Sequence, residues 1–210
     1  MTTRGTARGR LLDAAVEVIR GKGLSATSVD DLCAAAGVTK GAFFHHFESK
    51  QALAVAAADH WSATTGAMFA GAGYHELDDP VERIFGYLDL RAGLIIGSPA
   101  DYTCLVGTMT QEAFATHPDI REACAASIFG HAETLVPDMA AALELAGNPP
   151  GVDAKGLATY TQAVLQGSFV LSKASDEPQL VLDGIAHLRR YLEFLFDTNS
   201  NRQQRSAQHE

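Results

Sequence analysis

The segment GLSATSVDDLCAAAGVTKGAFFHHFESKQAL, residues 23–53, encodes two short helices separated by a glycine. The first begins near Thr27 and Ser28, each of which is followed three residues later by an aspartate, as in a capping box. It ends at Gly37, because glycine adopts the left-handed conformation of a C-cap without steric cost. A second helix of about two turns is predicted to start at Thr39. This arrangement predicts a helix-turn-helix.

The remainder of the chain is also predicted to be helical. Residues 8–23 carry apolar side chains at helical spacing, and an alanine-rich helix follows Ser49, which is its predicted N-cap. Five longer helices are expected at about 79–97, 102–116, 118–147, 152–174 and 178–197. Pro137 lies within the third of these and is expected to kink it. With no strand-like alternation and no internal repeat, the fold class is all-α, with about nine helices.

The change in helix length divides the chain into three predicted parts. An N-terminal helix-turn-helix domain of three helices occupies residues 1–50, and a larger helical domain for ligand binding and dimerisation occupies residues 51–198. The polar tail at 199–210 is expected to be disordered. The chain is long enough to bury a core without disulfides or metal ions.

Charge is distributed unevenly over a chain whose net charge is −9. Residues 1–50 hold seven Lys and Arg against five Asp and Glu, whereas the rest of the chain is strongly acidic. A mildly basic head on an acidic body fits a small module that faces a polyanion and a body that does not. The head is therefore expected to have a nucleic acid as its partner.

Cysteine usage and hydropathy exclude several classes of protein. The three cysteines, Cys33, Cys104 and Cys124, show no CxxC spacing, which argues against a disulfide framework or a zinc site. The run AGLIIG at 92–97 is far too short to span a membrane, and the N-terminus lacks a signal-peptide core. We expect a cytoplasmic protein without a metal, a cofactor or a membrane partner.

The second helix of the predicted helix-turn-helix is short, which suits a helix whose N-terminal turn enters the DNA major groove. Phe43 and Phe47 are expected to anchor it to the core. The candidates for its groove-facing surface are Thr39, Lys40, Gly41, Ala42, Phe44, His45 and His46. Thr27 or Ser28 is expected to reach the flanking DNA backbone, and Lys50 adds a cation beyond the helix. Alternatively, the motif is a structural corner with all three phenylalanines in the core.

Residues 8–53 resemble the DNA-binding region of the TetR family of transcriptional regulators. The resemblance carries the family's DNA-contacting positions onto Thr27, Thr39, Lys40, Gly41, Ala42, Phe44, His46 and Lys50. The chain departs from the family pattern at two of them: tyrosine is usual in place of Phe44, and serine or threonine is common in place of Ala42. Each missing hydroxyl removes a hydrogen bond worth about 1 kcal/mol, so we expect weaker DNA binding in the same mode.

The resemblance implies a ligand-responsive regulator, more commonly a repressor, that binds a palindromic operator as a homodimer and is released by a small molecule. It also implies that the body holds the small-molecule site, and an apolar cavity with a few polar groups would accept a mostly apolar effector. The candidate ligand-binding residues are Trp61, Thr65, Met68, Tyr102, Cys104, Met109, Phe129 and Gln166. For each of them, an ordinary place in the core is the alternative.

The last predicted helix has a narrow apolar seam that is typical of helix–helix interfaces. Its members, at steps of four and three residues, are Val181, Ile185, Leu188, Leu192 and Leu195. The helix before it contributes Leu157, Val164, Gly167 and Leu171. We expect these surfaces from two chains to form a four-helix dimer interface. Alternatively, the seam packs inside one monomer.

Two other functions compete with that of a regulator. A helical-bundle enzyme is disfavoured, because no glutamate is followed three residues later by histidine and neither a GxSxG elbow nor a P-loop occurs. The other rival is a helical small-molecule-binding protein whose head no longer binds DNA. We therefore expect a protein that is not an enzyme, and DNA binding by the head separates the remaining two functions.

Overall fold

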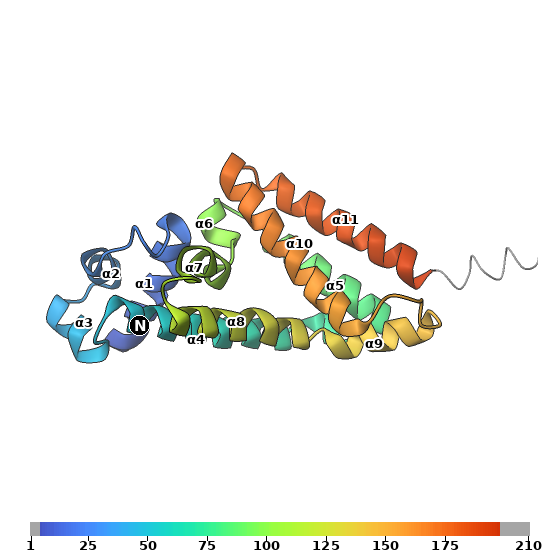
Figure 1. The fold of residues 1–210 in the computed structure, drawn as a ribbon, viewed down its shortest axis with the longest axis horizontal. Coiled ribbons are helices and arrows are strands. Elements are labelled where there is room, and N and C mark those ends of the chain that lie inside the picture. Colours follow the sequence, from blue (N-terminus) through green and yellow to red (C-terminus); the bar gives the residue numbers. More distant parts are fainter. Residues whose placement is uncertain (1–4, 198–210) are drawn as a thin grey trace, which may run out of the picture. The chain divides into compact units, whose positions relative to one another are not determined.

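The structure, a computed structural model, describes residues 5–197 (Figure 1). Over this range it contains eleven α-helices, one short 3-10 helix and no strand. The elements are α1 (Ala7–Lys22), α2 (Val29–Ala36), α3 (Lys40–His46), α4 (Lys50–Ala70), η1 (Gly73–Glu76), α5 (Pro80–Gly93), α6 (Pro99–Tyr102), α7 (Leu105–Ala113), α8 (Pro118–Glu133), α9 (Val136–Leu145), α10 (Ala154–Ser175) and α11 (Gln179–Phe196). The predicted all-α class is confirmed. The predicted tail at 199–210 lies outside the described residues.

The chain forms two compact units. Within the described range, the first comprises residues 5–69 and 97–130, and the second comprises residues 70–96 and 131–197. The first unit contains α1–α3 together with nearly all of α4, then α6, α7 and most of α8. The predicted boundary between residues 50 and 51 separates two functions and not two compact units, so it stays a prediction.

The core of the first unit is continuous from the short helices into the longer ones. Helix α1 packs against α2, α3, α6 and α7. Fully buried side chains come from α1, α3, α4 and α7, including Leu11, Phe43, Leu53 and Met109. The three-helix head therefore shares its core with helices that follow it in the chain, rather than enclosing a core of its own.

The second unit is built around α10 and α11, which lie side by side (orange and red in Figure 1). Helix α5 packs against α9 and α11, and the ion pair between Arg83 and Asp138, at 2.7 Å, joins α5 to α9. At Gly184 on α11, any larger residue would collide with the side chain of Ser168 on α10. The absence of a side chain at this one position allows the two helices to approach closely.

The predicted helix at 118–147 is instead two helices, α8 and α9. They are separated by a tight backbone turn at residues 134–135. Pro137, the second residue of α9, has no amide hydrogen, so it cannot donate to the carbonyl of Glu133 as a continuous helix requires. The proline therefore accompanies a break in the helix, where only a kink was predicted.

The predicted helix at 102–116 is also divided, into α6 and α7. The side chain of Cys104 caps α7, because its Sγ accepts a hydrogen bond from the amide of Gly107 at 3.5 Å. These two divisions account for the difference between the nine predicted helices and the eleven α-helices found. None of the helices within residues 5–197 is both long enough and apolar enough to cross a membrane.

Candidate nucleic-acid interface

The capping box predicted at the start of α2 is present. The Ser28 hydroxyl oxygen accepts a hydrogen bond from the amide of Asp31 at 3.1 Å, and the Asp31 carboxylate accepts one from the amide of Ser28 at 2.8 Å. Lys22, in the last turn of α1, forms an ion pair with the same carboxylate at 2.7 Å. Lys22 and then Ser28 hold the pKa of Asp31 well below its usual range. Asp31 therefore stays ionised and joins the end of α1 to the start of α2.

The turn between α2 and α3 has the predicted geometry. Gly37 adopts the left-handed conformation with a φ of 61°. Thr39 then caps α3, because its Oγ1 accepts a hydrogen bond from the amide of Ala42 at 3.2 Å. Arg10 of α1 donates to the last carbonyl of α2, that of Ala36, at 3.1 Å. The turn is therefore fixed by the conformation of Gly37 and by caps on both sides, with α1 bonded to the end of α2.

The three phenylalanines of α3 and its C-cap are divided between the core and the surface. Phe43 is 0% exposed and Phe47 is 5% exposed, and their ring centroids lie 6.0 Å apart. Phe44 is 55% exposed and contacts the ring of Phe43 edge-on. The interpretation in which all three rings belong to the core is therefore wrong. Phe43 and Phe47 anchor α3, and Phe44 lies on its outer side.

The outer side of α3 carries a cation, an aromatic ring and imidazole groups. Its residues, named here the α3 surface, are the exposed Thr39, Lys40, Gly41, Phe44 and His45 and the half-buried Ala42 and His46. Lys40 forms an ion pair at 2.8 Å with Asp30 of α2, and this carboxylate raises the pKa of Lys40. Both side chains stay largely exposed. Such a surface offers the groups that contact phosphates and base edges.

Thr27 and Lys50, predicted as DNA contacts, hold the turn between α1 and α2. The Lys50 ammonium donates to the carbonyls of Leu24, at 2.9 Å, and Thr27, at 2.8 Å. The Thr27 side chain is buried, and its hydroxyl donates to the carbonyl of Gly23 at 2.6 Å. The Thr27 prediction is corrected, because a buried hydroxyl is not presented to DNA. Lys50 is half-buried, and its assignment as a DNA contact stays a prediction. Ser28 remains exposed at the start of α2.

Glu112 of α7 binds the same turn, and nothing in the sequence predicted this. Its carboxylate accepts hydrogen bonds from the amides of Leu24, at 3.1 Å, and Ser25, at 2.6 Å. Gly23 has a φ of 88°, and a side chain there would collide with the Glu112 carboxylate. That glycine is the single local sign of the contact, because the partners lie far apart in the sequence. Lys50 and Glu112 are named the turn clamp below.

Replacing Glu112 with alanine is expected to lower the free energy of unfolding by about 1–2 kcal/mol, because two amides lose a charged acceptor. Glu122, an exposed glutamate of α8, supplies the matched control. The Glu122→Ala change should stay within about 0.5 kcal/mol of the unaltered protein in the same urea titration. Equal effects of the two changes would contradict a clamping role for Glu112.

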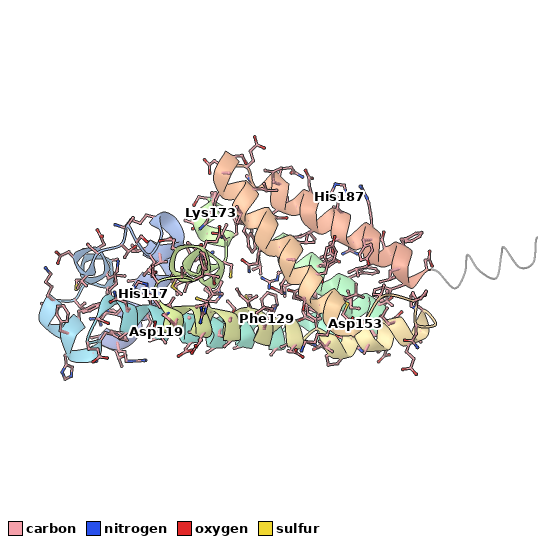
Figure 2. The ribbon with its side chains drawn as sticks, in the orientation of Figure 1. His117, Asp119, Phe129, Asp153, Lys173 and His187 are labelled. Atoms are coloured by element: carbon pink, nitrogen blue, oxygen red, sulfur yellow. The ribbon has the colours of Figure 1, made fainter. Side chains whose placement is uncertain are left out.

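The predicted ligand-binding residues are divided between the two units. Seven of them lie in the first unit, and Gln166, half-buried on α10, lies in the second. Met109 is fully buried in the core of the first unit, and its assignment as a ligand residue stays a prediction. The indole of Trp61 lies beneath the guanidinium of Arg20, with 5.0 Å from Cζ to the ring centroid. Phe129 is exposed on α8 (Figure 2).

The other four have mainly structural contacts. Tyr102 is buried, Cys104 caps α7, and the Thr65 hydroxyl bonds to the carbonyl of Trp61, whereas Met68 is exposed. A hollow of about 460 Å³ beside α1 and α6 is lined by charged groups of both signs, and one of about 110 Å³ lies at the turn clamp. Neither is lined by a predicted ligand residue. The position of the effector therefore stays a prediction.

The apolar seam of α11 is buried inside the second unit. Its members, each at most 6% exposed, are Val181, Ile185, Leu188, Leu192 and Leu195, and Leu157 of α10 is also buried. Helix α11 packs against α5 and α10 of its own chain. The assignment of these six residues to a dimer interface is corrected, because the strongest apolar repeat of α11 is covered by the same subunit.

A second apolar stripe remains uncovered on α10 and α11. The residues of this outer stripe are Tyr160, Val164, Gly167 and Leu171 of α10 and His187, Tyr191 and Phe194 of α11. The rings of Tyr160 and Tyr191 contact each other edge-on, with centroids 5.6 Å apart, so the two parts adjoin. Figure 2 shows His187 pointing away from α10. The spacing of Tyr191 and Phe194 could have indicated the part of the outer stripe on α11. The more regular apolar repeat of the buried seam was chosen as the interface instead.

Two family models match the sequence. The model described as bacterial regulatory proteins, tetR family, matches residues 11–57, which contain α2 and α3. The model described as transcriptional regulator LmrA/YxaF-like, C-terminal domain, matches residues 80–186, about half of the chain. The first match covers the helix-turn-helix, and the second covers most of the helices that follow.

Known relatives agree with both matches. The HTH-type transcriptional repressor KstR2 of Rhodococcus jostii (strain RHA1) is 44% identical over 46 residues, 22% of each chain. The HTH-type transcriptional regulator YerO of Bacillus subtilis (strain 168) is 33% identical over 52 residues, 25% of this chain and 18% of YerO. The matched part thus spans only about a fifth of each of these two relatives.

Likeness to solved structures extends over nearly the whole chain. The crystal structure of a TetR transcriptional regulator from Chloroflexus aurantiacus J-10-FL matches with a TM-score of 0.74 and 28% identity. The match covers 92% of this chain and 97% of that one. With both family models matched and the fold shared, the chain belongs to the TetR family of bacterial regulatory proteins.

Proposed function

We propose that this protein is a ligand-responsive transcriptional regulator that binds a palindromic DNA operator through its α3 surface. The observation that carries the proposal is the division of α3 into two sides. Phe43 and Phe47 fix the helix to the core, while Lys40, Phe44 and His45 stay exposed on its other side. A helix anchored in this way can contact the major groove without losing its core contacts.

The family supports regulation, and one relative supports repression. Both family models describe regulatory proteins, which favours a regulator over a helical-bundle enzyme. KstR2, which shares sequence with the helix-turn-helix, is described as a repressor. We therefore propose a repressor that acts in the cytoplasm, where the bacterial chromosome is.

Salt dependence of DNA binding tests the proposal at Lys40. The Lys40→Ala change is expected to weaken binding to the operator and to flatten the plot of log affinity against log salt by about 0.9 for one lost phosphate contact. The Asp30→Asn change should act in the opposite direction, because it removes the carboxylate that pairs with Lys40 near the DNA. Fluorescence anisotropy at several salt concentrations measures both slopes.

Arg190, an exposed arginine of α11, supplies the control for the Lys40 change. Arg190→Ala removes one positive charge outside the α3 surface and should leave the salt slope unchanged. Equal slopes for the unaltered, Lys40→Ala and Arg190→Ala proteins would exclude Lys40 as a phosphate contact. Absence of binding to any duplex would instead favour a helical small-molecule-binding protein whose head no longer binds DNA. The missing hydroxyls at Phe44 and Ala42 are the sequence features that favour this alternative.

We also propose that the outer stripe is the dimer interface. Leu171 and Phe194 are 58% and 68% exposed, and they belong to a stripe of several exposed apolar side chains, as is typical of protein–protein contact sites. Gly167 has no neighbouring atom within 4 Å of the position of a side chain, so a second helix has room to pack on it. Two successive faces of the major groove lie about 34 Å apart, and a twofold dimer is the assembly that would supply one α3 surface for each.

Introducing a charge into the outer stripe is expected to dissociate the dimer. Leu171→Glu should convert the protein to a monomer in analytical ultracentrifugation, because the twofold interface would bury two carboxylates, one from each chain. Leu145, 63% exposed on α9 and outside the stripe, provides the control. Leu145→Glu should sediment as the unaltered protein does, and a dimer that persists in Leu171→Glu would contradict the assignment.

The turn clamp supports a route for ligand control within the first unit. Lys50 is the first residue of α4, and Glu112 belongs to α7, so a shift of either helix acts on the turn before α2. An effector that prefers one arrangement of these helices would change operator affinity by about 1–3 kcal/mol. Mass spectrometry of a co-purified ligand would identify an effector, and operator affinity unchanged by that ligand would reject it.

A further inference from the structure

A cluster of four polar side chains lies inside the second unit, whereas the α3 surface belongs to the first. It comprises Tyr87 and Arg91 of α5, His131 in the last turn of α8 and Gln162 of α10. The Tyr87 hydroxyl lies 2.8 Å from Arg91 Nε, 3.0 Å from His131 Nε2 and 3.4 Å from Gln162 Nε2. A terminal guanidinium nitrogen of Arg91 lies 2.9 Å from the same His131 nitrogen. These four residues are named the Tyr87 cluster.

The donors around the Tyr87 hydroxyl oxygen and around His131 Nε2 determine which of these two atoms carries a proton. The Tyr87 oxygen accepts from Arg91 and Gln162, so its own proton is directed to His131 Nε2. The same imidazole nitrogen faces an Arg91 N–H, so it acts as an acceptor and carries no proton. Burial, and then the charge of Arg91, lower the pKa of His131 to about 3. At neutral pH the cluster therefore carries the single positive charge of Arg91.

Burial differs within the cluster. Tyr87 and Gln162 are buried, whereas Arg91 and His131 are half-buried and keep a path to solvent. The ring of Tyr74 packs edge-on against Tyr87, and burial raises the pKa of Tyr74 to about 12, so this phenol stays neutral. Arg91 also lies over the Tyr87 ring, with 5.3 Å from Cζ to the centroid. The Arg91 guanidinium is thus held in place by neutral aromatic and imidazole groups.

We propose that the Tyr87 cluster binds the carboxylate of an amphiphilic effector, with Arg91 as the charged contact. A guanidinium is the side chain best suited to a carboxylate, because its parallel N–H groups donate to both oxygens. Gln162 directs one of its two amide hydrogens to Tyr87, so the second can donate to the same carboxylate. In the half-buried setting of Arg91 a carboxylate is solvated less by water, which strengthens its attraction to the guanidinium.

This inference refines the proposed effector from mostly apolar to apolar with one anionic group. It rests on the proposal that the protein binds a ligand, but it does not depend on DNA binding. Gln166, a predicted ligand residue, lies one helical turn from Gln162 on α10 and is half-buried. The part of the effector beyond the carboxylate would therefore be sought along this side of α10.

Calorimetric titration of the full chain, without DNA, tests the inference with decanoate and 1-decanol as probes. These differ in charge and share an apolar chain. The unaltered protein should bind decanoate roughly tenfold or more tightly than decanol, as expected for charge-assisted hydrogen bonds. Arg91→Gln should abolish this preference, whereas Arg190→Gln, at an exposed position of α11, should retain it. Equal affinities in the unaltered protein, or a preference that survives Arg91→Gln, would overturn the proposal.

A measurement on the unaltered protein keeps the test valid if Arg91→Gln does not fold. Adding decanoate should shift the imidazole nitrogen resonances of His131, while those of His45, exposed on α3, should not move. An unchanged His131 at saturating decanoate would overturn the proposal. Preference for decanoate without any operator binding would support the carboxylate site and contradict the proposed regulatory function. Failure of the site and failure of the regulatory function are therefore distinguishable.

Discussion

Gly41→Glu is expected to abolish operator binding while leaving the fold intact. Gly41 is exposed in the first turn of α3, and a side chain built there would have only ordinary contacts. A carboxylate on the α3 surface would face DNA phosphates, and such like-charge contacts cost several kcal/mol, on the order of a hundredfold or more in affinity. Glutamate also suits the first turn of a helix better than glycine does, so the free energy of unfolding should be unchanged or slightly higher.

Gly41→Gln separates the effect of charge from that of size. Glutamine has nearly the same volume as glutamate, so any steric obstruction to DNA is common to both variants. Gel-shift titrations at low and high salt should show a much larger loss for glutamate, and the gap should narrow as salt increases. Unimpaired binding by Gly41→Glu would show that α3 does not enter the groove.

Phe43→Ala is expected to lower the free energy of unfolding by about 3–5 kcal/mol, because it removes a fully buried ring from the core of the first unit. Phe44→Ala should cost about 1 kcal/mol or less, since it removes an exposed ring and one edge-on contact. Urea unfolding of the two variants measures the difference. The pair is well matched because the residues are adjacent and chemically identical.

DNA-binding measurements on the two variants should distinguish a contact with DNA at Phe44 from a structural role at Phe43. Phe44→Ala should remain folded and bind the operator more weakly, whereas Phe43→Ala should lose binding only where the head unfolds. Similar unfolding energies for the two variants would contradict the division of α3 into an anchored side and an exposed side.

The local features of the fold could be predicted because they depend on short-range bonds. The cap at Ser28, the left-handed turn at Gly37 and the cap at Thr39 each involve residues within four positions of one another. The helix breaks near Cys104 and before Pro137 were harder to place, because each falls within an otherwise uninterrupted helical pattern. Periodicity alone could not show where such a pattern is interrupted.

The candidate site was predictable only in part, because the missing information is tertiary. Lys50 has the charge and the sequence position of a DNA contact. Only the structure shows that its ammonium binds the carbonyls of Leu24 and Thr27. Glu112 and Arg91 have no distinguishing local pattern, since their partners lie on other helices. The seam of α11 was identified correctly as an apolar repeat, but its repeat could not reveal which surface covers it.

The central claim is that an anchored α3 presents its outer surface to duplex DNA. Selection of binding sites from a pool of random duplexes by the intact protein, with Gly41→Glu selected in parallel, tests it most directly. We predict that the unaltered protein enriches an inverted repeat with half-sites about one helical turn apart, and that Gly41→Glu enriches nothing. Failure of the unaltered protein to enrich any sequence, or enrichment of the same repeat by Gly41→Glu, would contradict the claim.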